Sequence, residues 1–471
     1  MALAGLLALA FTAPALACLP CDGYFDPGFA NGGRRLLPLI AAHSDDGSYL
    51  DTTPLILHAA GGKILIAGSC EEDPSHHPDD FAEGCIVRLL PDGSTDYSFG
   101  PNTLGTVSLS QFDLYSTWVH AAALAANGDI LLAVQRDLFH HQVVRLSANG
   151  RNMKGKSDDF TISPGTGGQQ WNIAAMRVQP DGKILLAGSG LPGTYGPFFM
   201  AVVRMRADLS SLDADFGTDG RASVVFDVDA DGALESADVE SMVLQDDGRI
   251  VLAGGTGNEG APSTAAALAR LTPQGELDLS FGDGTGRVTG TFGEGFAKVE
   301  AMALDRQGRL LIGGTTAVNA ANGWGSDMIV NRLLADGSQD PVFGYLYPGD
   351  TPGPVVVGGD FGGDYNDGLT SLLVQDDGNI IALGAGELAS GAQHFEAVRL
   401  DGGNGTTDAL FGVNGASHGD FGCASDADAA ASGGIDAGGA VVVGYCHDAT
   451  GFHYGIARLF VDHIFGAGFE P

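Results

Sequence analysis

The chain of 471 residues has 58 acidic and 23 basic side chains, which give a formal net charge of -35 at pH 7. This charge repels phosphate backbones and anionic lipid surfaces over about a Debye length of 8 to 10 Å, so nucleic acid and acidic membranes are disfavoured as partners and cations are favoured. Glycine fills 73 positions, but 44% of the residues are hydrophobic, which indicates turn glycines of a folded chain rather than disorder.

The N-terminus is a short apolar run, Met1–Ala17, that ends in the small-x-small pattern of a signal-peptidase site. It predicts a cleaved signal peptide and an exported protein, secreted, periplasmic or at the cell surface. The usual basic n-region is absent, and a buried N-terminal helix is the alternative. No later stretch reaches the roughly 18 to 20 apolar residues that span a bilayer, so no membrane span is expected.

Six cysteines in an exported chain indicate an oxidising compartment and up to three disulfides. The predicted disulfides are the two local pairs, Cys70 with Cys85 and Cys423 with Cys446. Cys18 and Cys21 lie together beside the predicted cleavage point. A lipid on Cys18 is one alternative use; a redox motif is another, but it requires a βα context that is missing, so structural or incidental use is favoured.

A stretch with an Asp-Gly or similar pair between two short aliphatic runs recurs along the chain, most completely at Val178–Gly188. Only glycine enters the positive-φ positions of a tight turn without steric cost, so each copy predicts a β-hairpin. The seven copies are Gly61–Gly68, Asn127–Val134, Asp181–Gly188, Asp247–Gly254, Gln307–Gly314, Asp377–Gly384 and Ala437–Gly444.

A second short strand follows each hairpin and carries an arginine between apolar neighbours. The seven arginines are Arg88, Arg145, Arg204, Arg270, Arg332, Arg399 and Arg458. In most repeats an Asp-x-x-Phe-Gly signature comes next, at Asp96–Gly100, Asp213–Gly217, Asp278–Gly282, Asp340–Gly344 and Asp408–Gly412. An alternating strand then follows, clearest at Arg221–Phe226. Repeat two lacks the signature between Asn149 and Phe160, which leaves its blade junction open.

Each unit thus holds four short strands in about 60 residues, the content of one propeller blade. The predicted fold is all-β, a seven-bladed β-propeller of four-stranded antiparallel blades over residues 18–461, followed by a tail, 462–471. A parallel β-solenoid repeats over fewer residues and is the weaker alternative. Asp22–Phe29 matches the end of a repeat whose beginning is missing, so the two ends are expected to meet between the first and last blades.

The repeat resembles the family of delta-60 repeats, whose pattern is Gln-Pro-Asp-Gly-Lys-Ile-Leu-x-Ala-Gly followed by Arg-Leu-x-x-Asp-Gly-x-Leu-Asp-x-x-Phe-Gly. Gln179–Gly188 matches the first half and Arg270–Gly282 the second. The resemblance covers residues 22–468 and implies a secreted or surface-associated bacterial propeller. It implies no activity and no catalytic residues, because the family is defined by its repeat.

Repetition separates structural residues from candidate functional ones, because a residue present once per blade serves the fold. The arginines are therefore interpreted as charge-assisted donors that hold blade junctions. The Asp-Gly hairpins and the blade-to-blade turns are expected on one face, and the irregular connections on the other, which is the predicted functional face. Its polar candidates are Glu71, Glu72, Asp73, His76, His77, Asp79, Asp80, His140, His141, His394, His447 and His453. None has zinc-motif spacing, so solvated loops are favoured over a transition-metal site.

Calcium is the predicted cofactor. Asp227–Gly232 places aspartates at alternate positions before a glycine turn, as calcium loops do. The predicted ligands are Asp227, Asp229, Asp231, Glu235 and Asp238. Asp238 stands where a bidentate Glu would close a twelve-residue loop, and its shorter side chain weakens coordination. An acidic solvent loop is the alternative. Asp364, Asn366 and Asp367 form a poorer second candidate in repeat six.

The sequence predicts a monomeric, non-enzymatic propeller that binds a protein, glycan or surface ligand through its irregular face. A hydrolase or lyase with carboxylates or a metal at the channel mouth is the alternative, since propellers host such sites. A purely structural repeat is the third hypothesis. An enzyme needs a carboxylate pair or a His and metal cluster that converges at the central channel.

Overall fold

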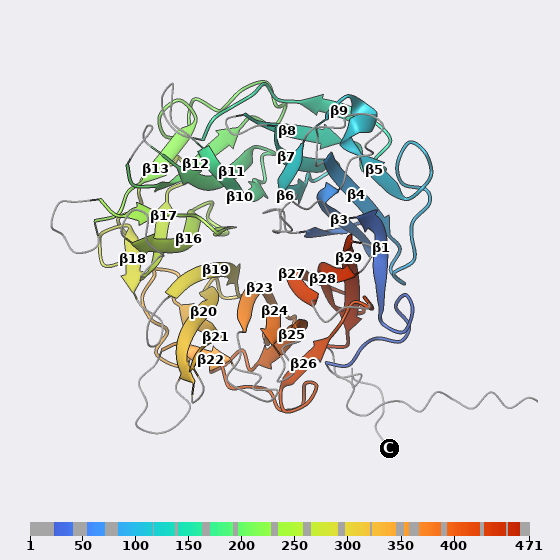
Figure 1. Ribbon diagram of the computed structural model, residues 1–471. Coiled ribbons are helices and arrows are strands. Elements are labelled where there is room, and N and C mark those ends of the chain that lie inside the picture. The colour runs from blue at the N-terminus through green and yellow to red at the C-terminus, as the bar shows by residue number, and fades with distance from the viewer. Residues whose placement is uncertain are drawn as a thin grey trace, which may run out of the picture.

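Seven small antiparallel sheets surround a common axis in the computed structural model of the chain (Figure 1). The structure describes residues 23–40, 54–70, 83–115, 117–136, 140–162, 170–191, 196–227, 234–257, 265–290, 297–320, 323–344, 353–357, 367–387, 393–423, 428–448 and 451–461. The prediction of a seven-bladed β-propeller is confirmed. Within these ranges no helix has the length and apolar character to cross a bilayer. The predicted signal peptide, Cys18, Cys21, the insertion 71–82 and the tail lie outside the described residues.

The blades are numbered in chain order from the first hairpin. Blade 1 contains β2 (Leu55–Ala59), β3 (Lys63–Cys70), β4 (Glu83–Leu89) and β5 (Thr106–Ser108), followed by the short helix η1 (Leu109–Phe112). Blade 2 contains β6 (Trp118–Leu124), β7 (Ile130–Gln135), β8 (His141–Leu146) and β9 (Met153–Lys156). Blade 3 contains β10 (Gln170–Val178), β11 (Ile184–Gly190), β12 (Phe199–Met205) and β13 (Arg221–Val224). Blade 4 contains β14 (Ser236–Ala237), β15 (Ser241–Leu244), β16 (Ile250–Gly257), β17 (Ala265–Leu271) and β18 (Arg287–Gly290).

The last three blades follow the same order. Blade 5 contains β19 (Ala297–Leu304), β20 (Leu310–Ala320), β21 (Gly323–Leu333) and β22 (Val355–Val357). Blade 6 contains β23 (Gly368–Val374), β24 (Ile380–Glu387), β25 (Gln393–Leu400) and β26 (Ala416–Gly419). Blade 7 contains β27 (Asp428–Asp436), β28 (Gly439–Asp448), β29 (Gly451–Leu459) and, from the other end of the chain, β1 (Arg34–Ile40).

The second strand of each blade is a continuous apolar run because both of its faces are covered. In β11, Leu185 and Ala187 pack in the core between blades 3 and 4, whereas Ile184 and Leu186 pack in the core between blades 2 and 3. Successive side chains of a strand point to opposite faces, so one run supplies two cores. Seven such interblade cores replace a single central one.

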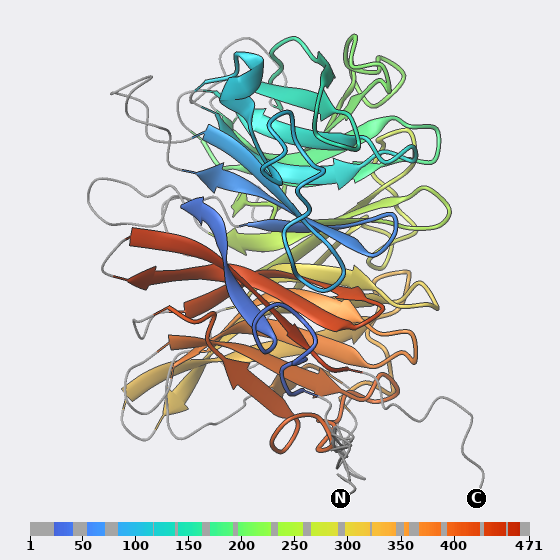
Figure 2. The same cartoon turned by 90° about the vertical axis from the view of Figure 1, so that its right-hand side faces the viewer.

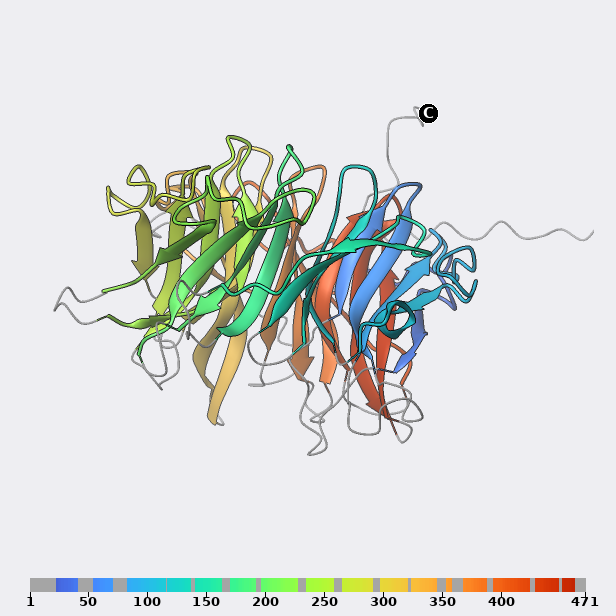
Figure 3. The same ribbon diagram turned by 90° about the horizontal axis from the view of Figure 1, so that it is seen from above.

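The expected position of the blade boundary was wrong. The Asp-x-x-Phe-Gly turn joins the third and fourth strands of one sheet, as β12 to β13, and the irregular segment after the fourth strand leads to the next blade. The Asp-Gly hairpins and Asp-x-x-Phe-Gly turns therefore share one face of the disc, the hairpin face. The blade-to-blade crossovers lie on the other face, the crossover face, with the connections between second and third strands (Figure 3).

The two ends of the described chain meet in blade 7, as expected from the partial repeat. Strand β1 pairs antiparallel with β29 and forms the outer strand of this blade (Figure 2). Arg458 of β29 donates from Nε to Asp26 over 2.8 Å and from Nη1 to the carbonyl of Pro91 in blade 1 over 2.7 Å. The N-terminal piece thus supplies an aspartate that pairs with the arginine of the last repeat.

The same arginine contact recurs around the ring and confirms the structural interpretation of these residues. Arg332, for example, donates from Nε to Asp340 of its own blade over 2.7 Å and to carbonyls of the next blade at Gly402 and Gly403. The carbonyls that accept from the other arginines belong to Ala148, Ala207, Pro273, Ala335, Val461 and Pro91. Each blade is therefore tied to the next by an arginine with a paired counter-charge, and all of these arginines except Arg145 are buried.

The phenylalanine of each signature packs under a glycine of the next blade. Arg332 lies 4.6 Å above the Phe343 ring, and a Cβ on Gly405 of blade 6 would come within 2.8 Å of that ring. The glycines also have positive φ, as Gly337 at 88°. Glycine is required at these positions for two reasons: any other residue would be strained at a positive φ, and its Cβ would clash with the phenyl ring.

Blade 2 lacks the signature, and residues of blades 2 and 3 replace the contacts that the signature makes in the other blades. The counter-charge of Arg145 is Asp129 of the hairpin turn, at 3.2 Å. On blade 3 the usual glycine is replaced by Leu209, which keeps a positive φ of 64° and is 4% exposed. Its side chain packs with Phe160 and Met205 in the core between blades 2 and 3. Leucine fills the place that a phenylalanine from blade 2 would take.

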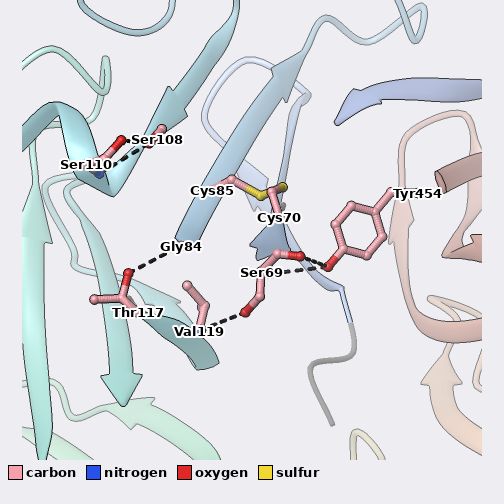
Figure 4. The surroundings of a disulfide bond; sticks show 9 residues. All are labelled: Ser69, Cys70, Gly84, Cys85, Ser108, Ser110, Thr117, Val119 and Tyr454. Atoms are coloured by element: carbon pink, nitrogen blue, oxygen red, sulfur yellow. Dashed lines mark hydrogen bonds between the residues drawn. A yellow bond between two sulfur atoms is a disulfide. The ribbon is translucent and has the colours of Figure 1, made fainter. Parts of the chain in front are cut away.

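The structure forms both predicted disulfides, Cys70–Cys85 and Cys423–Cys446. The first joins neighbouring strands β3 and β4 and closes the insertion between them (Figure 4). Beside it, the Tyr454 hydroxyl of blade 7 donates to the Ser69 carbonyl over 2.7 Å, and the Ser69 hydroxyl accepts from Val119 of blade 2. Blades 7, 1 and 2 are thus fastened at one point, and the disulfides fit an oxidising compartment.

Candidate functional site at the central channel

The first strands of the seven blades surround a central cavity of about 630 Å³ (Figure 1). Its walls are mostly apolar or small, with residues such as Leu57, Met176 and Leu372. Cavities of about 300 to 1,000 Å³ with apolar walls and a few polar groups are the usual form of ligand sites. The arrangement therefore directs attention to the polar groups in the wall.

Several of those polar groups stand on a recurrent β-bulge near the crossover face, whereas the Arg177 guanidinium lines the cavity from farther along β10. The register of the first strand against the second shifts by one residue in blades 2, 3, 5, 6 and 7, and in blade 4 the same break separates β14 from β15. The residues at the break, here called the bulge ring, are His120, Ala174, Glu240, Glu300, Thr370 and Ala431. A bulge redirects a side chain out of the sheet pattern, and five of these residues line the cavity.

The chemistry of the ring is concentrated in blades 4 and 5. Lys298 of β19 contacts Glu240 at 2.5 Å and Asp238 at 3.2 Å, and all three side chains are about one-third exposed. Glu300 lies two residues from Lys298 on the same strand and accepts from the Thr315 hydroxyl over 2.8 Å. We call Asp238, Glu240, Lys298 and Glu300 the channel-mouth group. It combines three carboxyl groups with one ammonium.

Burial and charge shift the protonation of this group in known directions. Burial acts to lower the pKa of Lys298, but the charges of Glu240 and Asp238 outweigh it and raise that pKa. Burial raises the pKa of the Glu300 carboxyl, against the donated bond from Thr315 and the charge of Lys298. Lys298 is thus a fixed cation held by Glu240, and burial favours the protonated form of the Glu300 carboxyl.

The structure describes three of the five predicted calcium ligands. Asp227 is exposed, Glu235 pairs with Phe226 through the backbone, and Asp229 and Asp231 lie outside the described residues. Asp238 uses one carboxylate oxygen to accept from Gly255 N–H over 2.6 Å and the other to contact Lys298. Asp238 is therefore held by the backbone of β16 and by Lys298 of blade 5, as well as ending the acidic crossover.

The described polar candidates of the irregular connections belong to blades 2, 6 and 7. His141 is fully buried and its ring lies 6.3 Å from that of His120, whereas His394 lies 6.4 Å from His418 on blade 6. The seven candidates of the 71–82 insertion lie outside the described residues. In the part of the chain that the structure describes, no three His, Cys, Asp or Glu side chains form a group that could hold a metal ion.

The channel-mouth group was missed by the sequence-based prediction, although a signal existed. Counting back eight residues from the turn glycines of blades 2 to 6 reaches His120, Ala174, Glu240, Glu300 and Thr370 in turn. Inside a repeat that fixes its neighbours as aliphatic, this position varies freely. A variable position at a constant distance from an invariant turn is the signal, and only the bulge explains why it faces the channel.

The fold and this cavity define a seven-bladed β-propeller with a polar mouth to an apolar channel. A family model described as a β-propeller domain of unknown function, DUF5122, matches residues 62–99, 245–281 and 308–343. Each matched segment runs from the first turn to the signature phenylalanine of blade 1, 4 or 5. The chain therefore carries repeats of a β-propeller family.

Solved structures with a similar course of the chain are distant in sequence. A protein of unknown function from Dyadobacter fermentans is 13% identical, with 78% of this chain and 98% of that chain covered and a TM-score of 0.40. The soluble aldose sugar dehydrogenase of Escherichia coli is 13% identical, with 72% and 96% covered and a TM-score of 0.40. PorZ, a surface component of the type-IX secretion system of Porphyromonas gingivalis, is 11% identical, with 86% and 46% covered and a TM-score of 0.41. No curated protein matches the chain significantly.

Proposed function

We propose that the chain is an exported bacterial propeller of the delta-60 type that binds a ligand, without transforming it, at the crossover end of its channel. The observation that carries the proposal is the bulge ring, in which five blades place a residue exempt from the repeat against the cavity and two neighbouring blades place Glu240 and Glu300 there. Residues that the fold does not dictate, aimed into one cavity, are expected at a binding site.

The ligand group that fits the channel mouth is a cation. Three carboxyl groups face the Lys298 ammonium, and the Arg177 guanidinium is a second cation in the cavity wall, so carboxyl groups outnumber cations by three to two. The formal net charge of -35 attracts cations over longer distances and repels anions. We therefore propose a basic side chain of a partner protein as the ligand, with the ammonium taking a place beside Lys298 between Glu240 and Glu300.

The test compares binding of the tripeptides Gly-Lys-Gly and Gly-Glu-Gly to the full chain by saturation-transfer NMR at low salt. We expect only the lysyl peptide to bind, and Glu240→Gln with Glu300→Gln to abolish its binding. Lys298→Met should strengthen it, because removal of the resident ammonium leaves the carboxylates to the ligand. Lys183→Met is the control, because Lys183 likewise pairs with a carboxylate, that of Asp213 at 2.8 Å, but lies on the hairpin face. Equal binding of both peptides would refute the proposal.

A hydrolase or lyase is the second candidate, and one observation favours it. The pKa of Glu300 is raised by burial, while Glu240 is held beside a cation, and two carboxyl groups with such unequal environments are the usual acid and base of glycoside cleavage. Release of nitrophenol from nitrophenyl glycosides, lost in Glu300→Gln, would establish this activity in place of simple binding.

Calcium remains a proposal for the acidic crossover, supported by the spacing of Asp227, Asp229, Asp231, Glu235 and Asp238. Because Asp238 also contacts Lys298, calcium bound there should stabilise both the crossover and the channel mouth. The experiment follows the melting temperature during a calcium titration. An upward shift that Asp229→Ala removes supports the site, and the absence of any shift contradicts it.

A further inference from the structure

A second cavity, of about 600 Å³, lies on the outer rim of the propeller between blades 2 and 3. One wall is formed by residues 157–161, which follow β9, and the other by the turn and outer strand of blade 3, with Ser210, Ser211 and Arg221. We call it the rim groove. It is distinct from the channel, whose lining shares no residue with it.

The rim groove exists because blade 2 breaks the repeat. In blades 1, 3, 4 and 5 the signature glycine donates its N–H to a carbonyl of the next turn, as Gly282 does to Asp336 over 3.0 Å. The signature segment thereby covers the seam to the following blade. Blade 2 has a short turn and no such segment, and Leu209 replaces only the phenylalanine of the inner layer. The outer layer stays open as a groove.

The groove combines an apolar floor with polar walls. Phe160, Met205 and Leu212 form the floor, and carboxylates and hydroxyls stand above it. Many of the donors in its surroundings are already used inside the protein: Arg221 donates from Nε to the Thr161 carbonyl over 3.1 Å, and Gln142 donates to Asp159 over 2.7 Å. The Ser210 hydroxyl likewise donates to Asp208 over 2.7 Å. The groove thus offers mainly acceptor oxygens to a ligand.

A ligand for such a surface carries several hydrogen-bond donors and an apolar face, and its charge is constrained from both sides. Asp158, Asp159 and the formal net charge of -35 oppose an anion, and the guanidinium of Arg221 in the wall offsets part of their attraction for a cation. A neutral saccharide meets every condition, because its hydroxyls donate to carboxylates and its C–H face packs on the floor. We propose that the rim groove is a binding site for neutral oligosaccharides.

The experiment measures binding of cellotetraose, mannotetraose and galactotetraose to the full chain by calorimetry, with spermidine as the cationic probe. We expect at least one saccharide to bind with a Kd below about 1 mM, the range of modest but specific sites. Ser210→Trp should fill the groove and weaken that binding at least tenfold. Ser338→Trp is the matched control, because Ser338 has the same turn contacts, with N–H and hydroxyl both donated to Asp336, on blade 5.

A second variant guards against misfolding, since Asp158→Ala changes an exposed side chain and should weaken binding several-fold with an unchanged circular dichroism spectrum. Glu240→Gln at the channel should leave saccharide binding unaltered. The proposal is overturned if none of the three saccharides binds, if spermidine alone binds, or if Ser210→Trp and Ser338→Trp bind saccharide equally well.

Discussion

The pairing of each signature phenylalanine with a glycine of the next blade makes a reciprocal substitution the sharpest test of how the ring is held. A Cβ on Gly337 would lie 2.7 Å from the Phe281 ring, and Gly337 has a φ of 88°. Gly337→Leu should therefore cost about 1 to 2 kcal/mol of backbone strain and about 1 to 3 kcal/mol of overpacking. Phe281→Ala alone should cost about 3 to 5 kcal/mol, because Phe281 is fully buried and Arg270 lies 4.8 Å above its ring.

The double variant should be far less damaged than the sum of the two, because it recreates the junction between blades 2 and 3. There Leu209 has a positive φ of 64° and occupies the space that no phenylalanine takes. In the double variant the alanine at position 281 removes the clash with the phenyl ring, and the leucine at position 337 refills the cavity that the ring leaves. Only the backbone strain at position 337 persists, so we expect a favourable coupling of about 2 kcal/mol or more. Urea unfolding followed by circular dichroism measures it. Additive costs, within about 0.5 kcal/mol, would refute the compensation argument.

Three further predictions concern the same ring. Burial acts to raise the pKa of Asp278, but hydrogen bonds from Ser280 and Arg249 and the charge of Arg270 lower it to about 2. The ionised carboxylate therefore contributes about 2 kcal/mol to the free energy of unfolding above pH 4, and this contribution is lost as the pH falls toward 2. Urea unfolding midpoints measured across that pH range test the loss. Asp26→Ala should cost about 1 to 3 kcal/mol, because buried Arg458 loses its closer carboxylate but keeps Asp436 at 3.3 Å, whereas exposed Asp246→Ala should cost little in the same urea assay. Reduction of Cys423–Cys446, which closes a separation of 23 residues, should cost about 3 kcal/mol, seen as a lower melting temperature in reductant that Cys423→Ser with Cys446→Ser reproduces.

The fold could be predicted because every blade repeats the same local chemistry. Turn glycines such as Gly182 and apolar runs such as Ile184–Gly190 set hairpins without tertiary information. The blade boundary could not be predicted in this way, because a repeat has no natural starting point in the sequence. The strand order of the sheets, such as β10-β11-β12-β13, shows that a blade begins at the channel and ends at the rim, and the pairing of β1 with β29 completes this order in blade 7.

The candidate site was less predictable for a different reason. The sequence directs attention to long polar connections, because those are the visible departures from the repeat. Glu240, Lys298 and Glu300 instead sit within strands or beside them, where an alternating pattern predicts a side chain against a neighbouring blade. A one-residue bulge changes that direction, and bulges depend on hydrogen-bond register, which composition and spacing do not reveal.

Departures from the repeat divide into two kinds, and the difference bears on function. At the seam between blades 2 and 3, Leu209 replaces a missing phenylalanine and Asp129 replaces a missing counter-charge for Arg145, so the chain itself completes the contact. Departures of this kind preserve the stability of the blade junction although its residues differ from the repeat. The channel mouth and the rim groove are departures of a second kind, because they gather carboxyl groups in the wall of a cavity, Glu240 and Glu300 in one and Asp158 and Asp159 in the other. Polar side chains that the repeat does not dictate and that line a cavity are explained most economically by a ligand.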